Sequence, residues 1–363
     1  MNARNGFLSA IGFMQQSARL MGAVPGSSLL CDCRELERKF EAFRLFQYAD
    51  REMGIAATRP PIHEVVRRTL NQDPFRAIWI LEGIGRILGS EASLLVEGLL
   101  AEGSGSLVPD EALLPLNTGM GMGFGEKLLG MLGSHPSEGE LRGMIQRFIG
   151  MCRANCRPGW EDASVEPICL LVRTLHPHLL APASSAMEAA SPGWRRLFWH
   201  GVGRGLYFAP TNFLPIHGAH KRMVRGAAAE GDSVDDRRQA IAGLTWAVAL
   251  VNLEQPGVIR SLLPIGAELG IQMEFTNGVI SALLAWRHMA PRDERRLRTY
   301  TRPSPAQDGS KDLWETWVET PAREALENVY SGLESRNRIA ALYTYRPPEE
   351  LLELSGVHPK EKT

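Results

Sequence analysis

The chain has 363 residues, of which 44% are hydrophobic and 22% are charged, and its formal net charge at pH 7 is −1. This composition is typical of a globular protein, and without a stretch that concentrates Lys and Arg beside aromatic residues it argues against nucleic acid as a partner. Five cysteines, an odd number in a long chain, argue against a disulfide framework and favour a reducing compartment, so we expect a cytoplasmic protein.

The chain begins with a segment in which apolar residues recur at helical spacing. Phe7, Leu8, Ile11, Met14 and Ala18 lie on one face if residues 1–22 form a helix. Such a helix either docks on the core of the protein or makes a peripheral contact with a membrane. The chain has no run of 18 apolar residues, so we expect no membrane-spanning helix.

Apolar residues at intervals of three and four continue along most of the chain, and alternating patterns are rare. Helix boundaries are expected at Asp73-Pro74, at residues 134–137, at Ser191-Pro192 and at Thr320-Pro321. Ser191 and Thr320 each fit an N-cap followed by proline in the first helical position. The sequence therefore predicts an all-α protein with an N-terminal extension (1–39), a helical-repeat domain (40–302), and a C-terminal loop and helical pair packed on it (303–363).

A Gly-x-Gly pattern recurs within the predicted helices at 81–89, 117–125 and 199–207, with weaker copies at 241–250 and 276–286. The leading glycines are Gly83, Gly119, Gly201, Gly243 and Gly278. Their spacing of about 35 to 42 residues, with one double step that places a degenerate copy near Gly159, is typical of helix-pair repeats. We therefore predict stacked helical hairpins.

Each glycine within a helix destabilises that helix by about 1 kcal/mol relative to alanine. A compensating role for these glycines is therefore expected. Either the glycines let a neighbouring helix approach closely, or the bare backbone leaves room for a ligand between helices. No strand precedes these glycines, which argues against a dinucleotide site.

The helix at 194–210 also carries a row of polar residues. Arg196, His200, Arg204 and Tyr207 share one face at helical spacing. This face is either solvated or receives a carboxylate or the polar end of a ligand. In the repeat register Arg86 corresponds to Arg204 and Glu82 to His200, which predicts an inward arginine cluster and an acid/base pair.

The histidines and cysteines do not form a metal-binding motif. His176 and His178, His217 and His220, and Cys152 and Cys156 are close in sequence, but each pair lacks further ligands at the required spacing. We predict no metal site, and the sequence identifies no cofactor.

Five segments resemble a bacterial family of unknown biochemical function that is associated with enediyne biosynthetic gene clusters. They read FRAIWILEGIGRILG (75–89), NTGMGMGF (117–124), LFWHGVGRGLYFAPTNFLP (197–215), RRQAIAGLTWAVAL (237–250) and TNGVISALLAWR (276–287). Where the family has a Gly-aromatic-His stretch, this chain has RPGWEDASVEPICLLV (157–172), so a role for that histidine does not carry over.

The resemblance implies a role in polyketide biosynthesis, with a long apolar polyene as ligand and a protein encoded nearby as possible partner. We expect catalytic or anchoring roles for Glu82, His200, Arg204 and Tyr207. The expected substrate-binding residues are Arg86, Arg196, Met120, Met122, Gly201, Gly203, Phe208 and Trp246. On this hypothesis, Arg204→Ala abolishes function without unfolding the protein. The alternative is a non-catalytic helical-repeat scaffold that docks a partner protein of the same pathway.

Overall fold

A computed structural model describes residues 30–55, 60–214, 219–303 and 311–356, and the predicted amphipathic segment at 1–22 lies outside these ranges. Within the described residues the chain forms helices and no strand, which confirms the prediction of an all-α protein. None of these helices is both long and apolar enough to cross a bilayer.

The helices of the first half are α2 (Leu30–Gln47), α3 (Ala49–Glu52), α4 (Ile62–Leu70), α5 (Pro74–Glu91), α6 (Leu113–Leu129), α7 (Glu138–Asn155), α8 (Glu161–Val165), α9 (Pro167–Leu175) and α10 (Leu180–Ala190). Those of the second half are α11 (Trp194–Tyr207), α12 (Ala219–Ala229), α13 (Val234–Val251), α14 (Pro256–Leu269), α15 (Gln272–Met289), α16 (Glu294–Arg298), α17 (Lys311–Trp314), α18 (Thr320–Glu324), α19 (Tyr330–Ser335) and α20 (Pro348–Ser355). Short 3-10 turns include η3 (Asp110–Ala112), η5 (Pro210–Phe213) and η8 (Ile339–Tyr343).

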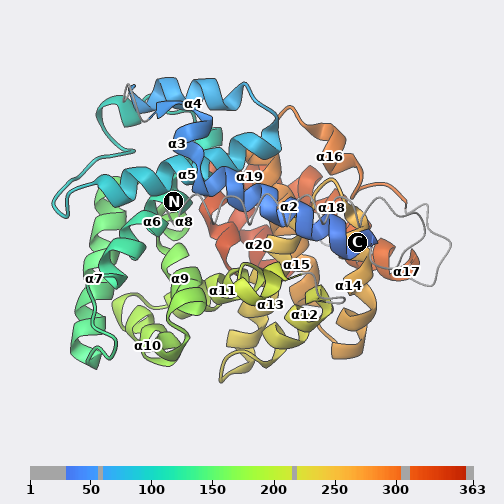
Figure 1. The fold of residues 1–363 in the computed structure, drawn as a ribbon. Helices are drawn as coiled ribbons and strands as arrows, with labels where there is room; N and C mark the ends of the chain where they lie inside the picture. Colours follow the sequence, from blue (N-terminus) through green and yellow to red (C-terminus); the bar gives the residue numbers. More distant parts are fainter. Residues whose placement is uncertain (1–29, 56–59, 215–218, 304–310, 357–363) are drawn as a thin grey trace.

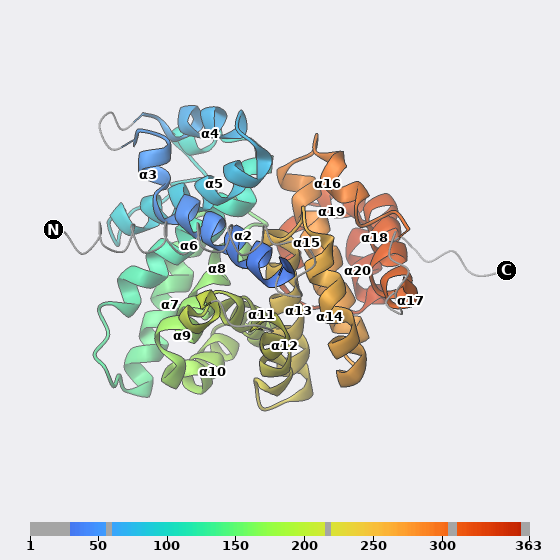
Figure 2. The ribbon, with the colours of Figure 1, turned by 45° about the vertical axis from the view of Figure 1, so that its right-hand side comes forward.

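The helices pack in a series that closes on itself. α5 packs on α6, α6 on α8 and α9, α9 on α11, α11 on α13, and α13 on α15, which in turn contacts α6. α2 packs on α5, α13 and α14, while η8 packs on α8, α11 and α15. Figures 1 and 2 show α2 crossing the front of this series. The C-terminal helices α19 and α20 lie behind α2 in Figure 1 and beside α18 in Figure 2. The series therefore surrounds a buried centre.

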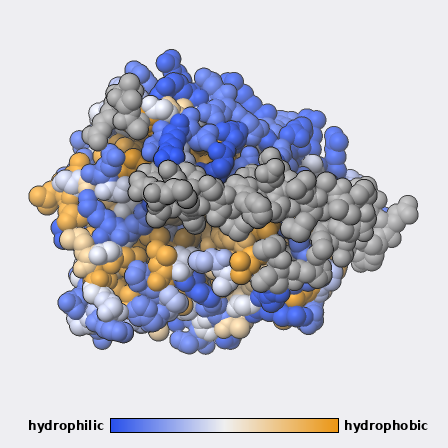
Figure 3. Space-filling view, in the orientation of Figure 1, coloured by the Kyte–Doolittle hydropathy of each residue, from blue (hydrophilic) through white to orange (hydrophobic). Residues whose placement is uncertain are grey.

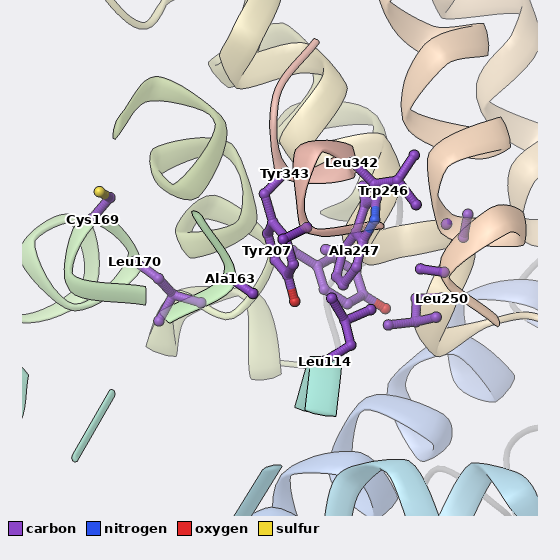
Figure 4. Close-up of a cluster of buried hydrophobic side chains, with 14 of the residues drawn as sticks. Leu114, Ala163, Cys169, Leu170, Tyr207, Trp246, Ala247, Leu250, Leu342 and Tyr343 are labelled. Carbon is purple, nitrogen blue, oxygen red and sulfur yellow. The ribbon is translucent and has the colours of Figure 1, made fainter. Parts of the chain in front are cut away.

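One hydrophobic core extends from Ala42 to Leu351. It includes Ile339, Leu342 and Tyr343 from the C-terminal segment. The described parts of 40–302 and 303–363 thus share a core. Within it Tyr343 lies beside Trp246 (Figure 4), with ring centroids 5.4 Å apart.

The glycines of α6 explain the alternating pattern. Residues i and i+2 of a helix point about 200° apart, to nearly opposite faces. A Cβ at Gly119 or Gly123 would overlap backbone carbonyl oxygens of α5. One at Gly121 would overlap the carbonyl oxygen of Ser164, and one at Gly125 would crowd Leu171, both on the α8–α9 side. The pattern therefore lets two helices pack closely on opposite sides of a third.

α11 is packed in the same way between α9 and α13. A Cβ at Gly203 would overlap the carbonyl oxygen of Ala240 in α13, and Gly243 faces back onto the carbonyl oxygen of His200. Gly201 lies against Glu166 and Cys169 at the start of α9. Close helix approach is thus the role of these glycines. The prediction that Gly201 and Gly203 leave room for a ligand is wrong, because neighbouring helices occupy that space.

Three of the four predicted helix boundaries are present, at Asp73-Pro74, at residues 134–137 and at Ser191-Pro192, whereas the N-caps predicted at Ser191 and Thr320 are not. Asp73 caps α5 by accepting hydrogen bonds from the backbone amides of Phe75 and Arg76, and Ser137 forms a capping box with Glu140 at the start of α7. Ser191, however, ends α10, and the N-cap of α11 is Gly193 with φ of +87°.

Thr320 is not an N-cap, because helical structure continues from residue 311 to residue 335 through two π-helical turns, Glu315–Glu319 and Ala325–Val329. The first π turn ends at Glu319, two residues before Pro321. A widened turn accommodates the proline, which lacks an amide hydrogen and would otherwise clash with the preceding turn.

The degenerate repeat copy expected near Gly159 is not a glycine helix. Gly159 has φ of +89° and lies in the turn between α7 and α8, against Asn337. Helix α8 then packs on α6, and α9 passes between α6 and α11. The repeat architecture itself stays a prediction.

Candidate functional site

A cavity of about 290 Å³ lies between α2, α5, α6, α9 and the end of α11. This volume is at the lower end of the range for small-molecule sites, roughly 300–1,000 Å³. Its lining residues are Ala42, Phe43, Phe46, Gln47, Trp79, Glu82, Met122, Glu126, Leu170, Leu171, Thr174, Leu175, Arg204, Phe208 and Pro210. Hydrophobic residues also gather on the surface over α9 and α11, in the lower half of Figure 3. Most of the lining is apolar, with Glu82, Glu126 and Arg204 as its ionisable groups.

Arg204 is almost completely buried, with 1% of the residue exposed. Its Nη1 donates a hydrogen bond of 2.6 Å to Oε2 of Glu166. The guanidinium carbon lies 4.7 Å from the ring centroid of Trp246 and 5.2 Å from that of Tyr343, a favourable cation–π arrangement. Within the described residues its Nε has no hydrogen-bond partner. The arginine is therefore held at the inner wall of the cavity by one carboxylate and two aromatic rings.

Glu166 is fully buried and joins Arg204 to His200. The distance between His200 Nδ1 and Glu166 Oε1 is 3.3 Å. Burial lowers the pKa of His200 below its ordinary value, although Glu166 opposes the shift, so the imidazole is neutral near pH 7. Because a carboxylate paired with arginine only accepts hydrogen bonds, Nδ1 carries the proton and donates it. His200 thereby orients Glu166, and Glu166 orients Arg204.

Glu82 is the second carboxyl group beside Arg204. Its Oε1 lies 3.8 Å from Arg204 Nη2, which is beyond hydrogen-bond distance. Burial raises the pKa of Glu82 to about 7; Arg204 opposes this shift and Glu166 reinforces it. Glu82 therefore gains and loses a proton near neutral pH, as a general acid or base requires.

The raised pKa of Glu82 has a measurable effect on stability. The folded protein holds this proton more tightly than the unfolded chain, so stability falls as pH rises from about 4.5 to about 7. We expect the wild type to lose up to about 3 kcal/mol over this window relative to Glu82→Gln, which has no proton to lose. Urea denaturation of both proteins at several pH values measures the difference, and parallel pH profiles would contradict it.

The four polar residues that the spacing predicts on one face of α11 do not share one environment. His200, Arg204 and Tyr207 are buried, so the solvated-face alternative is wrong for them. Arg196 is partly exposed and pairs with Asp235 and Glu350, away from the cavity.

Tyr207 is also placed away from the cavity. Asn252 Nδ2 donates a hydrogen bond of 3.0 Å to its hydroxyl oxygen. The ammonium of Lys39 lies 4.0 Å from its ring centroid. Burial raises the pKa of Tyr207 well above its usual value. Its contacts therefore tie α11 to α2 and α13.

The predicted arginine cluster does not form as expected. Arg86 donates from Nε to both carboxylate oxygens of Glu126 at 2.9 Å, and no ion pair connects it with the partners of Arg204. His200 and Glu82 do not form the predicted acid/base pair, since His200 contacts Glu166 instead.

Of the predicted apolar contacts, Met122 and Phe208 line the cavity, whereas Met120 is buried outside the lining. Trp246 lies behind the cavity, against Arg204. The structure therefore brings Glu82, Arg204, Met122 and Phe208 of the predicted site residues to one cavity.

Sequence reasoning missed Glu166 and Tyr343. Glu166 lies in the stretch that departs from the family pattern, and its signal was an acidic residue directly before a run of apolar residues, EPICLLV. Tyr343 comes from the C-terminal segment and hydrogen-bonds through its hydroxyl to Thr118 Oγ1 at 2.6 Å. No local pattern marks it as a site residue.

Across the described residues, no group of three or more His, Cys, Asp or Glu side chains is arranged to hold a metal ion. Cys152 and Cys156 are buried, and burial raises the pKa of both thiols. The side chains of His217 and His220 lie outside the described part of the chain.

No family of known proteins matches the chain significantly, and neither a curated protein nor a solved structure does. The geometry of the cavity is therefore the basis for assigning a function.

Proposed function

We propose that the chain binds a long apolar molecule in the cavity between α2 and α9 and places the polar end of that molecule against Glu82 and Arg204. The class of ligand that the resemblance implies is a linear polyene, and the process is enediyne-type polyketide biosynthesis in the cytoplasm. The observation that carries the proposal is an apolar cavity whose inner wall holds a buried arginine and a carboxyl group with a pKa of about 7.

The lining supports an elongated, flat ligand. Four aromatic side chains face the cavity, two from α2, one from α5 and one at the end of α11: Phe43, Phe46, Trp79 and Phe208. Aromatic rings offer large apolar surfaces for contact with a conjugated chain. Leu170 and Leu171 of α9 form the opposite side. This is the mainly apolar lining with few convergent polar groups that ligand sites share.

The polar wall supports acid/base chemistry or ligand positioning. Glu82 and Arg204 line the cavity and are the candidate catalytic residues. His200 does not line it and is a positioning residue that acts through Glu166. Tyr207 neither lines the cavity nor contacts Glu166, and its contacts with Lys39 and Asn252 stabilise the packing of α11.

Filling the cavity should abolish binding. Thr174 lies on α9 in the lining, and Thr174→Trp would place an indole in the cavity. Ser185→Trp on α10 is the matched control, because Ser185 is exposed and outside the lining. Diphenylhexatriene, a linear polyene hydrocarbon whose fluorescence increases in apolar sites, is the probe.

We expect saturable binding of this probe to the wild type and to Ser185→Trp, and at least about tenfold weaker binding to Thr174→Trp, because the introduced side chain competes for the same apolar volume. Equal binding to the two variants would contradict the proposed site.

The scaffold alternative is supported by the glycines, which serve helix packing and do not line the cavity. It requires a partner polypeptide that stays bound during purification, whereas the proposed function requires a small molecule in the cavity. A membrane contact through residues 1–22 is a separate proposal, tested by deleting that segment and measuring membrane recovery.

A further inference from the structure

The polar wall of the cavity restricts which polar group a ligand can place there. Arg204 Nη1 is used by Glu166, at 2.6 Å. Nη2 makes no hydrogen bond to a described residue, and its nearest carboxylate oxygen, Glu82 Oε1, is 3.8 Å away. Nη2 of Arg204 is therefore a hydrogen-bond donor at the cavity wall without an acceptor among the described residues.

A single acceptor atom can hydrogen-bond to both Arg204 Nη2 and the carboxyl group of Glu82. The separation of 3.8 Å between Nη2 and Oε1 is shorter than two hydrogen bonds of about 2.8 Å laid end to end. An oxygen placed between them can therefore accept one hydrogen bond from Arg204 and one from the protonated carboxyl group of Glu82. A carbonyl oxygen has the two lone pairs that this requires.

The charges around this position argue against an ionised ligand. Arg204 is already compensated by Glu166, so a ligand carboxylate would add an uncompensated buried charge. An ammonium group has no acceptor for Nη2. The other ionisable groups nearby are His200, Tyr343 and Cys169, all uncharged near pH 7, and Glu126, which pairs with Arg86. Helix α2 contributes no charged residue to the lining.

We propose that the ligand presents an uncharged carbonyl oxygen, as in a ketone, aldehyde or ester, between Arg204 Nη2 and Glu82 Oε1. This inference rests on the proposed function and names the class of its substrate. Two donors on one carbonyl oxygen polarise it, which is the arrangement that stabilises negative charge developing on that atom.

Displacement of diphenylhexatriene by matched ligands tests the inference. The ligands are a long-chain methyl ketone and the fatty acid, primary amine and alkane of the same chain length. Near pH 6, we expect the ketone to bind at least about tenfold more tightly than the other three. Its affinity should fall severalfold towards pH 8.5 as Glu82 loses its proton. Glu82→Gln, which keeps an N–H donor, should retain the preference for the ketone and lose the pH dependence.

The outcomes separate this inference from the proposed function. A fatty acid that binds as tightly as the ketone, an alkane that does so, or an unchanged pH dependence in Glu82→Gln overturns the carbonyl site while the apolar cavity stands. Failure of diphenylhexatriene and of all four ligands to bind overturns both.

Discussion

Replacing Arg204 by methionine is expected to lower the free energy of unfolding by about 3–5 kcal/mol, because it leaves the buried carboxylate of Glu166 without its partner. Glu166 is fully buried, and its other described hydrogen bond comes from a neutral histidine. The expectation from the sequence, that Arg204→Ala abolishes function without unfolding the protein, stays a prediction, and the buried pair adds to it a cost in stability.

A second substitution distinguishes loss of the ion pair from loss of packing. In Arg204→Met/Glu166→Gln both charges are absent, and the glutamine amide oxygen can still accept from His200 Nδ1. Removing both members of a buried pair is often close to neutral, so we expect the double variant to recover most of the lost stability. Urea denaturation of the wild type and the two variants measures this. A double variant no more stable than Arg204→Met would show that the charge of Glu166 is not the cause.

Gly119→Ala is expected to lower the free energy of unfolding by about 2 kcal/mol or more, because the added Cβ overlaps the carbonyl oxygen of Glu82 and forces two backbones apart. This cost exceeds the gain of about 1 kcal/mol in helix propensity that alanine brings. The displaced atom belongs to a helix backbone and cannot rotate aside as a flexible side chain would.

Gly150→Ala is the matched control. Gly150 lies within α7, where an added Cβ would meet open space. Here only helix propensity acts, so the same substitution should raise stability by up to about 1 kcal/mol. Thermal and urea denaturation of both variants test the role of the Gly-x-Gly pattern. Equal effects of the two substitutions would mean that close helix packing does not explain it.

Much of the fold was predictable because helices form where apolar residues recur at short, regular intervals along the sequence. The three- and four-residue spacing of apolar side chains identified an all-α protein, and the glycines marked the helices that pack most closely. What the spacing could not show is that residues i and i+2 serve two different neighbours. That requires knowing that α9 passes between α6 and α11, which depends on contacts between separate helices.

The site was predictable only in part for the same reason. Helical geometry correctly placed His200 and Arg204 on one face of α11, but whether that face meets water or protein depends on Glu166, Trp246 and Tyr343. These residues come from distant segments. Glu82 was found through its repeat register, although the partner that the structure gives it is Arg204 and not His200.

Native mass spectrometry combined with optical absorption, on the protein purified from its producing cell, shows whether the cavity holds a small molecule. We expect the wild type to carry a small apolar molecule, and Thr174→Trp to carry none because its indole fills the cavity. If the two proteins have the same bound mass, or if the wild type retains a second polypeptide and no small molecule, the cavity is not the functional site.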